Sequence, residues 1–338
     1  MGQLANLSSM MRISTTRNDA MKIATHHPIV WFTRRILSGV VVVWAAATFA
    51  FLIQCVLPGD RAQIIINVTS GNVGPASSAE LAAINAKYGF DQPLVVQYGK
   101  YILGILHGDL GESYQQHRPV AGIITEQIGP TIILAVAALL IAWIIAILTT
   151  LFIAGRDNIW SKLLNDTQVF LATVPPYWLA TILLVVFAVK LRILPVIGGN
   201  SPVGLILPTL ALALELSGFF GQVVQNEFTR VLEQPFVTSA RARGMSDFGV
   251  RLRHVLRHAA LPGITLSGWA LGKLLSGAIL IEVVFARQGL GGVLVAATSS
   301  RDVPIVSGAV LISASVFVIA NLIVDLTYRL VDPRIKLT

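Results

Sequence analysis

Six long apolar stretches alternate with polar segments along this chain of 338 residues. A helix that rises ~1.5 Å per residue needs roughly 20 residues to cross about 30 Å of hydrocarbon. Each stretch meets that length, so the pattern predicts six membrane-spanning helices. They are expected at Ile36–Leu57, Gly129–Ala154, Val169–Val189, Val203–Val224, Ile264–Phe285 and Ile305–Leu326.

The composition supports this prediction. Hydrophobic residues make up 54% of the chain and charged residues only 12%, which is too apolar for a soluble globule. We expect an all-α polytopic membrane protein, with a first apolar stretch too long for the core of a cleaved signal peptide. The expected divisions are a polar cytoplasmic extension at 1–28, a first transmembrane helix at 29–57, an external segment with short helices at 58–127, and a membrane core at 128–338 that contains a cytoplasmic loop at 227–262.

The distribution of lysine and arginine predicts the orientation. With the N-terminus inside, the inner segments hold sixteen of these residues and the outer segments eight. The positive-inside rule then places both termini and the loop Thr238–Pro262 in the cytoplasm. The net charge of +8 is explained by this bias and requires no nucleic-acid partner.

The loop Thr238–Pro262 carries the densest charge in the chain and predicts a helix, a turn and a second helix. Thr238–Arg243 is compatible with a helix, Gly244 tolerates a positive φ, and Ser246 or Asp247 can cap the second helix. Pro262 then suits the first turn of the next apolar helix. A loop that only sets the orientation of the protein does not need this ordered series of turn and capping residues, so we expect the loop to dock a partner.

Within the second predicted helix, apolar and basic residues occupy different faces. Such an amphipathic helix can present its basic face to solvent or to a partner. The apolar face holds Val250, Val255, Leu256 and Leu261, and the rest holds Arg251, Arg253, Arg257, His254 and His258.

Four charged residues fall inside the predicted spans, where each costs a few kcal/mol if it faces lipid. Glu282 and Asp325 lie close enough to span ends to snorkel. Glu215 and Lys273 lie nearer the middle. This central pair either forms a structural salt bridge or lines a transport route, and the sequence leaves both alternatives open.

Other features shape the expected architecture. Pro175–Pro176 and Pro208 interrupt backbone hydrogen bonding within spans, as in bent transporter helices. In the external segment, Ala83–Tyr88 and Val95–Leu106 predict two short helices. Gly268 and Gly272 form a GxxxG step that favours close helix packing.

Motifs for catalysis or metal binding are weak. The stretch Gly268–Leu274 lacks the glycine spacing and the hydroxyl residue of a nucleotide-binding loop. His107 and His117 lack a ligand spacing, and arginines that would repel a cation surround His254 and His258. We expect a non-catalytic chain without a metal site or a bound cofactor.

Taken in order, several motifs resemble the permease subunits of ABC importers for dipeptides, oligopeptides and nickel. The resemblance covers over nine-tenths of the chain. It is carried by Trp31–Leu37, Leu57–Asp60, Tyr88–Leu94, Gln97–Tyr98, His107–Gly111, Thr238–Pro262, Gly289–Gly292, Arg301–Pro304, Asn321–Leu326 and Asp332–Arg334.

The resemblance implies a type I importer fold and a coupling role for the loop, whose short helix enters a groove on a cytoplasmic ATPase. Thr238, Ser239 and Ala240 stand where the general importer motif has an acidic residue and two alanines. Partners implied are a second permease, two ATPases that bind ATP and Mg, and an external substrate-binding protein. The implied coupling residues are Thr238, Ser239, Ala240, Arg241, Ala242, Arg243, Gly244, Met245 and Ser246.

The substrate class follows less directly. We favour peptides as the substrate, with nickel or metal chelates as the alternative within the same importer class. A secondary transporter is the alternative from another class. The sequence offers no convincing internal repeat to support it, and this interpretation would leave the basic loop unexplained.

Overall fold

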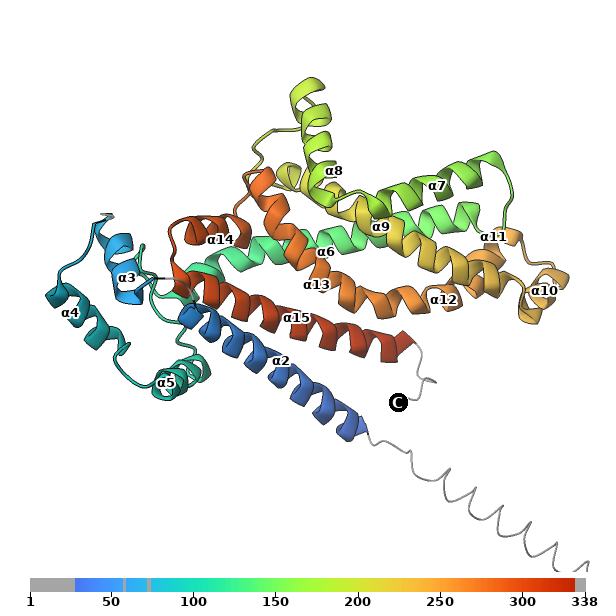
Figure 1. Ribbon diagram of the computed structural model, residues 1–338. Helices are drawn as coiled ribbons and strands as arrows, with labels where there is room; N and C mark the ends of the chain where they lie inside the picture. The colour runs from blue at the N-terminus through green and yellow to red at the C-terminus, as the bar shows by residue number, and fades with distance from the viewer. Residues whose placement is uncertain (1–27, 57–58, 72–73, 332–338) are drawn as a thin grey trace, which may run out of the picture.

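The computed structural model describes residues 28–56, 59–71 and 74–331. All regular elements in these ranges are helices, joined by short connections (Figure 1). The expected extension at 1–28 falls almost wholly outside the described residues, as do Asp332 and its neighbours. Five helices are long and apolar enough to span a membrane. They are α2 (Pro28–Val56), α6 (Val120–Ile153), α9 (Pro202–Leu232), α13 (Leu261–Val284) and α15 (Val303–Val331).

The third predicted span is not one straight helix. It is built from α7 (Ile159–Thr173) and α8 (Pro176–Leu183), which continues as the π-helical segment η1 (Leu184–Lys190). The two parts are bent by 109°, so the described helices provide five spans, or six if the bent pair counts as one. The bend follows from the two prolines, because Pro175 is extended and neither ring nitrogen can donate a hydrogen bond.

Four short helices gather at one end of the bundle (Figure 1). The sequence predicted α4 (Ser78–Tyr88) and α5 (Leu94–Leu106), but α3 (Arg61–Ser70) and α14 (Leu290–Ser299) were missed. The sequence pattern gave no helix for the stretch directly before α15, where α14 lies. The second span also begins earlier than predicted, at Val120 rather than Gly129.

The basic loop lies at the opposite end (Figure 1). It contains α10 (Pro235–Ala242), α11 (Asp247–Val250), the π-helical turn η2 (Arg251–Val255) and α12 (Leu256–Ala259). The first turn of α2 and the last turn of α15 point toward this same end. The loop and the described ends of the chain therefore share one side, as the sequence predicts, and the assignment of that side to the cytoplasm stays a prediction.

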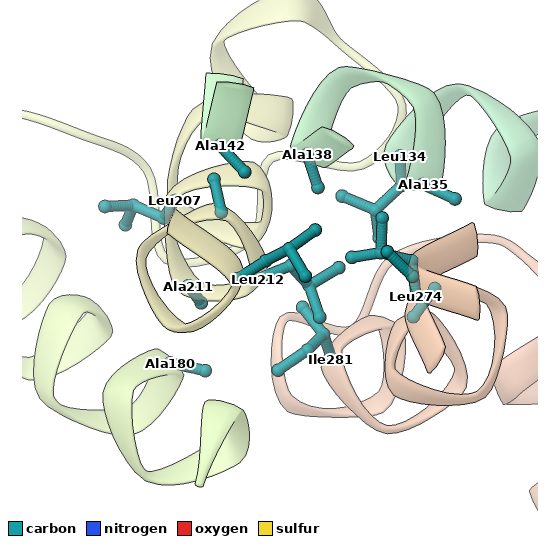
Figure 2. Packing of buried hydrophobic residues seen from close by; sticks show 14 of the residues in the cluster. Leu134, Ala135, Ala138, Ala142, Ala180, Leu207, Ala211, Leu212, Leu274 and Ile281 are labelled. Carbon is teal, nitrogen blue, oxygen red and sulfur yellow. The ribbon is translucent and has the colours of Figure 1, made fainter. Parts of the chain in front are cut away.

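The core is built from small and medium side chains on α6, α8, α9 and α13 (Figure 2). Alanines dominate it, which lets the backbones approach closely where the hydrophobic effect between helices is absent in lipid. The residues at the centre include Leu134, Ala138, Ala142, Ala180, Ala211, Leu212, Leu274 and Ile281.

The predicted GxxxG step also packs closely. A Cβ on Gly268 would lie 2.6 Å from Asn321 Oδ1, and one on Gly272 would lie 2.6 Å from the Phe317 ring. Both glycines therefore face α15, and the packing interpretation is confirmed.

Candidate functional site

The basic loop folds as the helix, turn and helix that its sequence predicts. α10 ends at Ala242, and Gly244 adopts a φ of +82° in the turn after it. The Ser246 hydroxyl accepts a hydrogen bond from the Gly249 N–H and caps the second helical segment. Pro262 stands in the first turn of α13, as expected.

One face of the loop is buried against the ends of α6 and α9. Val250 and Val255 are fully buried, as their predicted common face requires. Apolar packing of this kind fixes the loop to the membrane helices rather than leaving it free. The shared cluster comprises Val237, Ala240, Val250, Val255 and Ala259 of the loop, Leu151 and Ala154 of α6 and its end, and Val224, Phe228 and Val231 of α9.

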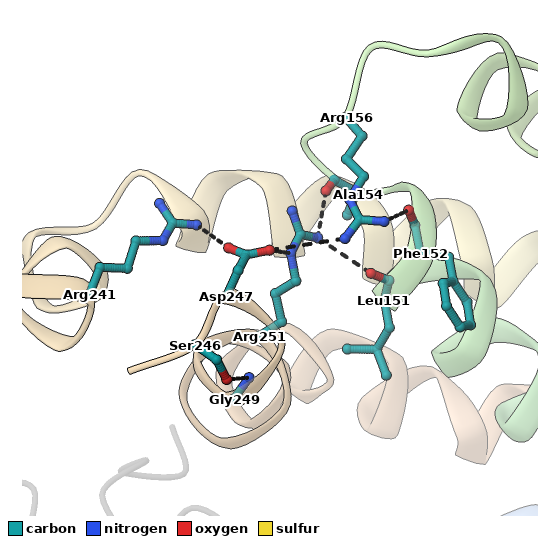
Figure 3. Close-up of polar contacts among 9 residues, drawn as sticks. All are labelled: Leu151, Phe152, Ala154, Arg156, Arg241, Ser246, Asp247, Gly249 and Arg251. Carbon is teal, nitrogen blue, oxygen red and sulfur yellow. Dashed lines mark hydrogen bonds and ion pairs between the residues drawn. The ribbon is translucent and has the colours of Figure 1, made fainter. Parts of the chain in front are cut away.

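Arg251 corrects one expectation, because only 4% of it is exposed although the sequence placed it on the basic outer face. Its Nη1 donates to the carbonyl oxygens of Ala154 at 2.8 Å and Leu151 at 3.4 Å (Figure 3). The last carbonyls of a helix have no intrahelical donor. Arg251 supplies one, and its charge also suits the negative end of the α6 dipole.

Asp247 holds the other side of this arrangement. Its carboxylate accepts from Arg251 Nε at 2.7 Å and from Arg241 Nη2 at 2.8 Å, and Arg156 Nη2 lies 4.0 Å away (Figure 3). The hydrogen bond from Arg251 is the main cause that lowers the pKa of Asp247. The ion pair therefore stabilises the loop at neutral pH, and its contribution is lost only as the pH falls below about 4 toward that lowered pKa.

The opposite face of the loop is exposed. Arg241 and Gly244 are among the exposed residues, whereas Ala240 lies in the core and Met245 is half-buried. Two exposed apolar residues, Phe248 and Leu252, were missed by the sequence reasoning. Their spacing of four residues on the helix was the available signal. The exposed surface comprises Phe236, Thr238, Ser239, Arg241, Ala242, Arg243, Gly244, Ser246, Phe248 and Leu252.

The central charged pair is formed in the membrane core. Lys273 Nζ of α13 lies 2.5 Å from Glu215 Oε1 of α9, and it also lies 5.4 Å from the Trp269 ring. The Glu215 side chain is 11% exposed and the Lys273 side chain 41%. The two side chains therefore pair, which was one of the two alternatives that the sequence left open, and the lining of a route stays a prediction.

The two charges nearer the span ends behave differently from each other. Glu282 is fully buried, which corrects the expectation that it snorkels. It accepts hydrogen bonds from Thr131 Oγ1 at 2.7 Å and from the Gly291 N–H at 2.8 Å, so its oxygens are satisfied inside the protein. Asp325 of α15 pairs with Arg35 of α2.

Comparison with known proteins gives the class of this chain. Residues 146–337 match the family described as binding-protein-dependent transport system inner membrane component, and residues 29–135 match the N-terminal region of such membrane components. A putative peptide transport system permease protein of Brucella abortus is 33% identical, over 90% of this chain and 98% of the relative. A glutathione transport system permease protein of Salmonella paratyphi A is also 33% identical, over 90% and 97%.

The chain belongs to the inner membrane components of binding-protein-dependent transport systems. It is a multi-pass inner-membrane permease subunit of an ABC importer with a type I fold, as the sequence resemblance implied. It performs no catalysis itself, because ATP hydrolysis in such systems belongs to partner ATPases. A substrate-binding protein is the other partner that this class implies.

Substitution of Arg251 tests whether the loop is fixed to α6. Arg251→Gln removes the charge between Asp247 and two carbonyls, and we expect a loss of about 1–3 kcal/mol of local stability. Hydrogen exchange should then accelerate in α11, α12 and the last turn of α6.

Arg253→Gln is the matched control, because Arg253 is an exposed arginine on the same segment. We expect it to leave exchange unchanged. Equal acceleration in the two variants would show that Arg251 has no special anchoring role.

Proposed function

We propose that this chain forms half of the translocation pathway for di- and oligopeptides and couples closure of the partner ATPases to opening of that pathway. The observation that carries the coupling role is the loop between α9 and α13. It is fixed to α6 by Arg251 and presents a separate exposed surface to a partner.

The proposed partners are those that membership of this family implies. ATP and Mg bind to two cytoplasmic ATPase subunits, and this chain binds neither. A second, related permease supplies the other half of the pathway. The external segment at 58–127 and the stretch Gly289–Pro304, which lie at the end opposite the loop, contact the binding protein and the second permease (Figure 1).

The peptide substrate is supported by the relatives, whose names specify peptides and glutathione. Nickel or a metal chelate is the alternative from the sequence, and no contact in the described structure favours it. The family also favours an importer subunit over a secondary transporter.

In the proposed mechanism, ATP binding draws the two ATPases together and moves the docked loop. The apolar cluster and the Arg251 contacts pass this motion to α6 and α9. The bundle then rocks against the second permease and alternates access between the two sides.

The docking surface is tested at Phe248, which is 58% exposed on the loop. Buried aromatic anchors dominate protein interfaces and often contribute about 2 kcal/mol or more. We expect Phe248→Ala to lower co-purification of the ATPases about tenfold or more, as measured by quantitative mass spectrometry of the complex from native membranes.

Phe49→Ala is the matched control, because Phe49 is 63% exposed on α2, outside the loop. It should leave the ATPases bound. A chain that co-purifies with no ATPase in its unaltered form, or normal uptake by the chain without ATPases, would contradict the proposal.

Single and double substitutions can distinguish a role of Glu215 and Lys273 in the pathway from a purely structural role. Either single substitution, Glu215→Gln or Lys273→Gln, leaves one charge unpaired in the core, and stability should fall. The double variant removes both charges, so we expect thermal stability to recover in detergent.

Transport distinguishes the two roles. If Lys273 lines the route, peptide uptake in proteoliposomes should stay impaired in the stable double variant. Uptake that recovers together with stability would assign the pair to structure alone.

A further inference from the structure

A cavity of about 420 Å³, open to the outside, lies at the end of α13 that is remote from the coupling loop. It is bounded by the last turn of α13, by α14 and by Gln127 of α6. Most of its lining is apolar, but the lining also includes a carboxylate and a guanidinium, and such groups are costly among membrane helices unless they have partners. The lining includes Gln127, Glu282, Ala286, Arg287, Gln288 and Val293.

Arg287 is only partly satisfied in this cavity. Only 5% of the residue is exposed, and its buried Nε has no hydrogen-bond partner among the described residues. Nη1 lies 3.4 Å from the Gly199 carbonyl oxygen, a long contact. No carboxylate lies within 4.0 Å of the guanidinium in the described part of the chain. A guanidinium offers five donors and remains charged at neutral pH, so most of its binding capacity is unused.

The neighbouring carboxylate does not consume this capacity. Both oxygens of Glu282 accept from neutral donors, the Thr131 hydroxyl and the Gly291 N–H. Gly289 packs against the same carboxyl group, since a Cβ there would lie 2.3 Å from its carbon. Glu282 is thus held in place without an ion pair to Arg287, although it lines the same cavity.

We propose that this cavity is a transit site for the C-terminal carboxylate of an entering peptide, with Arg287 as the group that binds it. This inference rests on the proposed peptide-importer function. A carboxylate matches the planar, forked donors of a guanidinium, which bind such groups in a bidentate manner. The buried position of Arg287 suits a small terminal group better than the flat surface of a partner protein.

The charge of Glu282 sets the strength of the site. A second carboxylate in the cavity is repelled by Glu282 while it is attracted by Arg287. Binding is therefore weaker than at an isolated buried arginine. A site on a transport route requires such a balance, because a substrate that binds tightly would not leave.

The test compares two probes, trialanine and its C-terminal amide, in the complete importer reconstituted with its own binding protein and ATPases. Uptake of both is measured for the unaltered chain and for Arg287→Gln. The binding protein selects peptides in the same way for the unaltered chain and for the variant. Its contribution therefore cancels when the ratio of trialanine uptake to amide uptake is compared between the two.

We expect Arg287→Gln to lower trialanine uptake about tenfold and amide uptake less than twofold, since a charged hydrogen bond to the carboxylate is lost. Arg287→Lys should retain most of the preference for the acid. Arg192→Gln, at an exposed arginine outside the cavity, should change neither rate.

Other results would overturn the inference. An unchanged ratio, or an equal loss for acid and amide, would show that Arg287 does not bind the carboxylate. A loss of complex assembly without a change in the ratio would assign Arg287 to contact with a partner protein. Failure of the proposed function is distinguishable, because the unaltered importer would then carry neither probe.

Discussion

The arrangement of the coupling loop depends on the hydrogen bonds that Arg251 donates to carbonyl oxygens at the C-terminal end of α6. A helix of 34 residues ends there with carbonyl groups that need donors. The buried guanidinium supplies them from the loop while Asp247 neutralises its charge. Together with the apolar cluster beside it, this side chain joins the loop to a membrane helix, and its contacts explain why a basic residue is buried where the sequence pattern places it outside.

The same helix makes a second polar contact nearer to its N-terminus, at Thr131. Thr131 of α6 donates to Glu282 and accepts from the Leu290 N–H, and Glu282 in turn holds the Gly291 N–H. From Thr131 to Leu151 is about 20 residues, or about 30 Å of helix. α6 is therefore a rigid connection between the coupling loop and the turn that begins α14, beside the cavity of Arg287. A motion of the loop can therefore pass through α6 to the opposite end of the bundle, where α14 begins.

Periodicity and length predicted the long helices, the capped loop and the Gly244 turn, because these features depend on local spacing. The cost of charge in lipid singled out Glu215 and Lys273 but left open whether they pair or line a route. The sequence did not reveal α3 and α14, whose short lengths lack a clear amphipathic pattern. Nor did it reveal the burial of Arg251 and Glu282, since each depends on groups far away in the chain. The bend at Pro175 was foreseen as a break, but its angle depends on how α8 packs against α9 and α13.

The central claim is that the loop and α6 move as one body when the ATPases close. After Cys55, the single cysteine of the chain, is replaced by serine, spin labels at Arg257 of the loop, outside the docking surface, and at Phe152 report the separation of loop and helix in the assembled importer. We predict that ATP leaves this distance unchanged while it shifts the distance from Arg257 to a label on the second permease. A change of several ångströms between Arg257 and Phe152 would contradict the account.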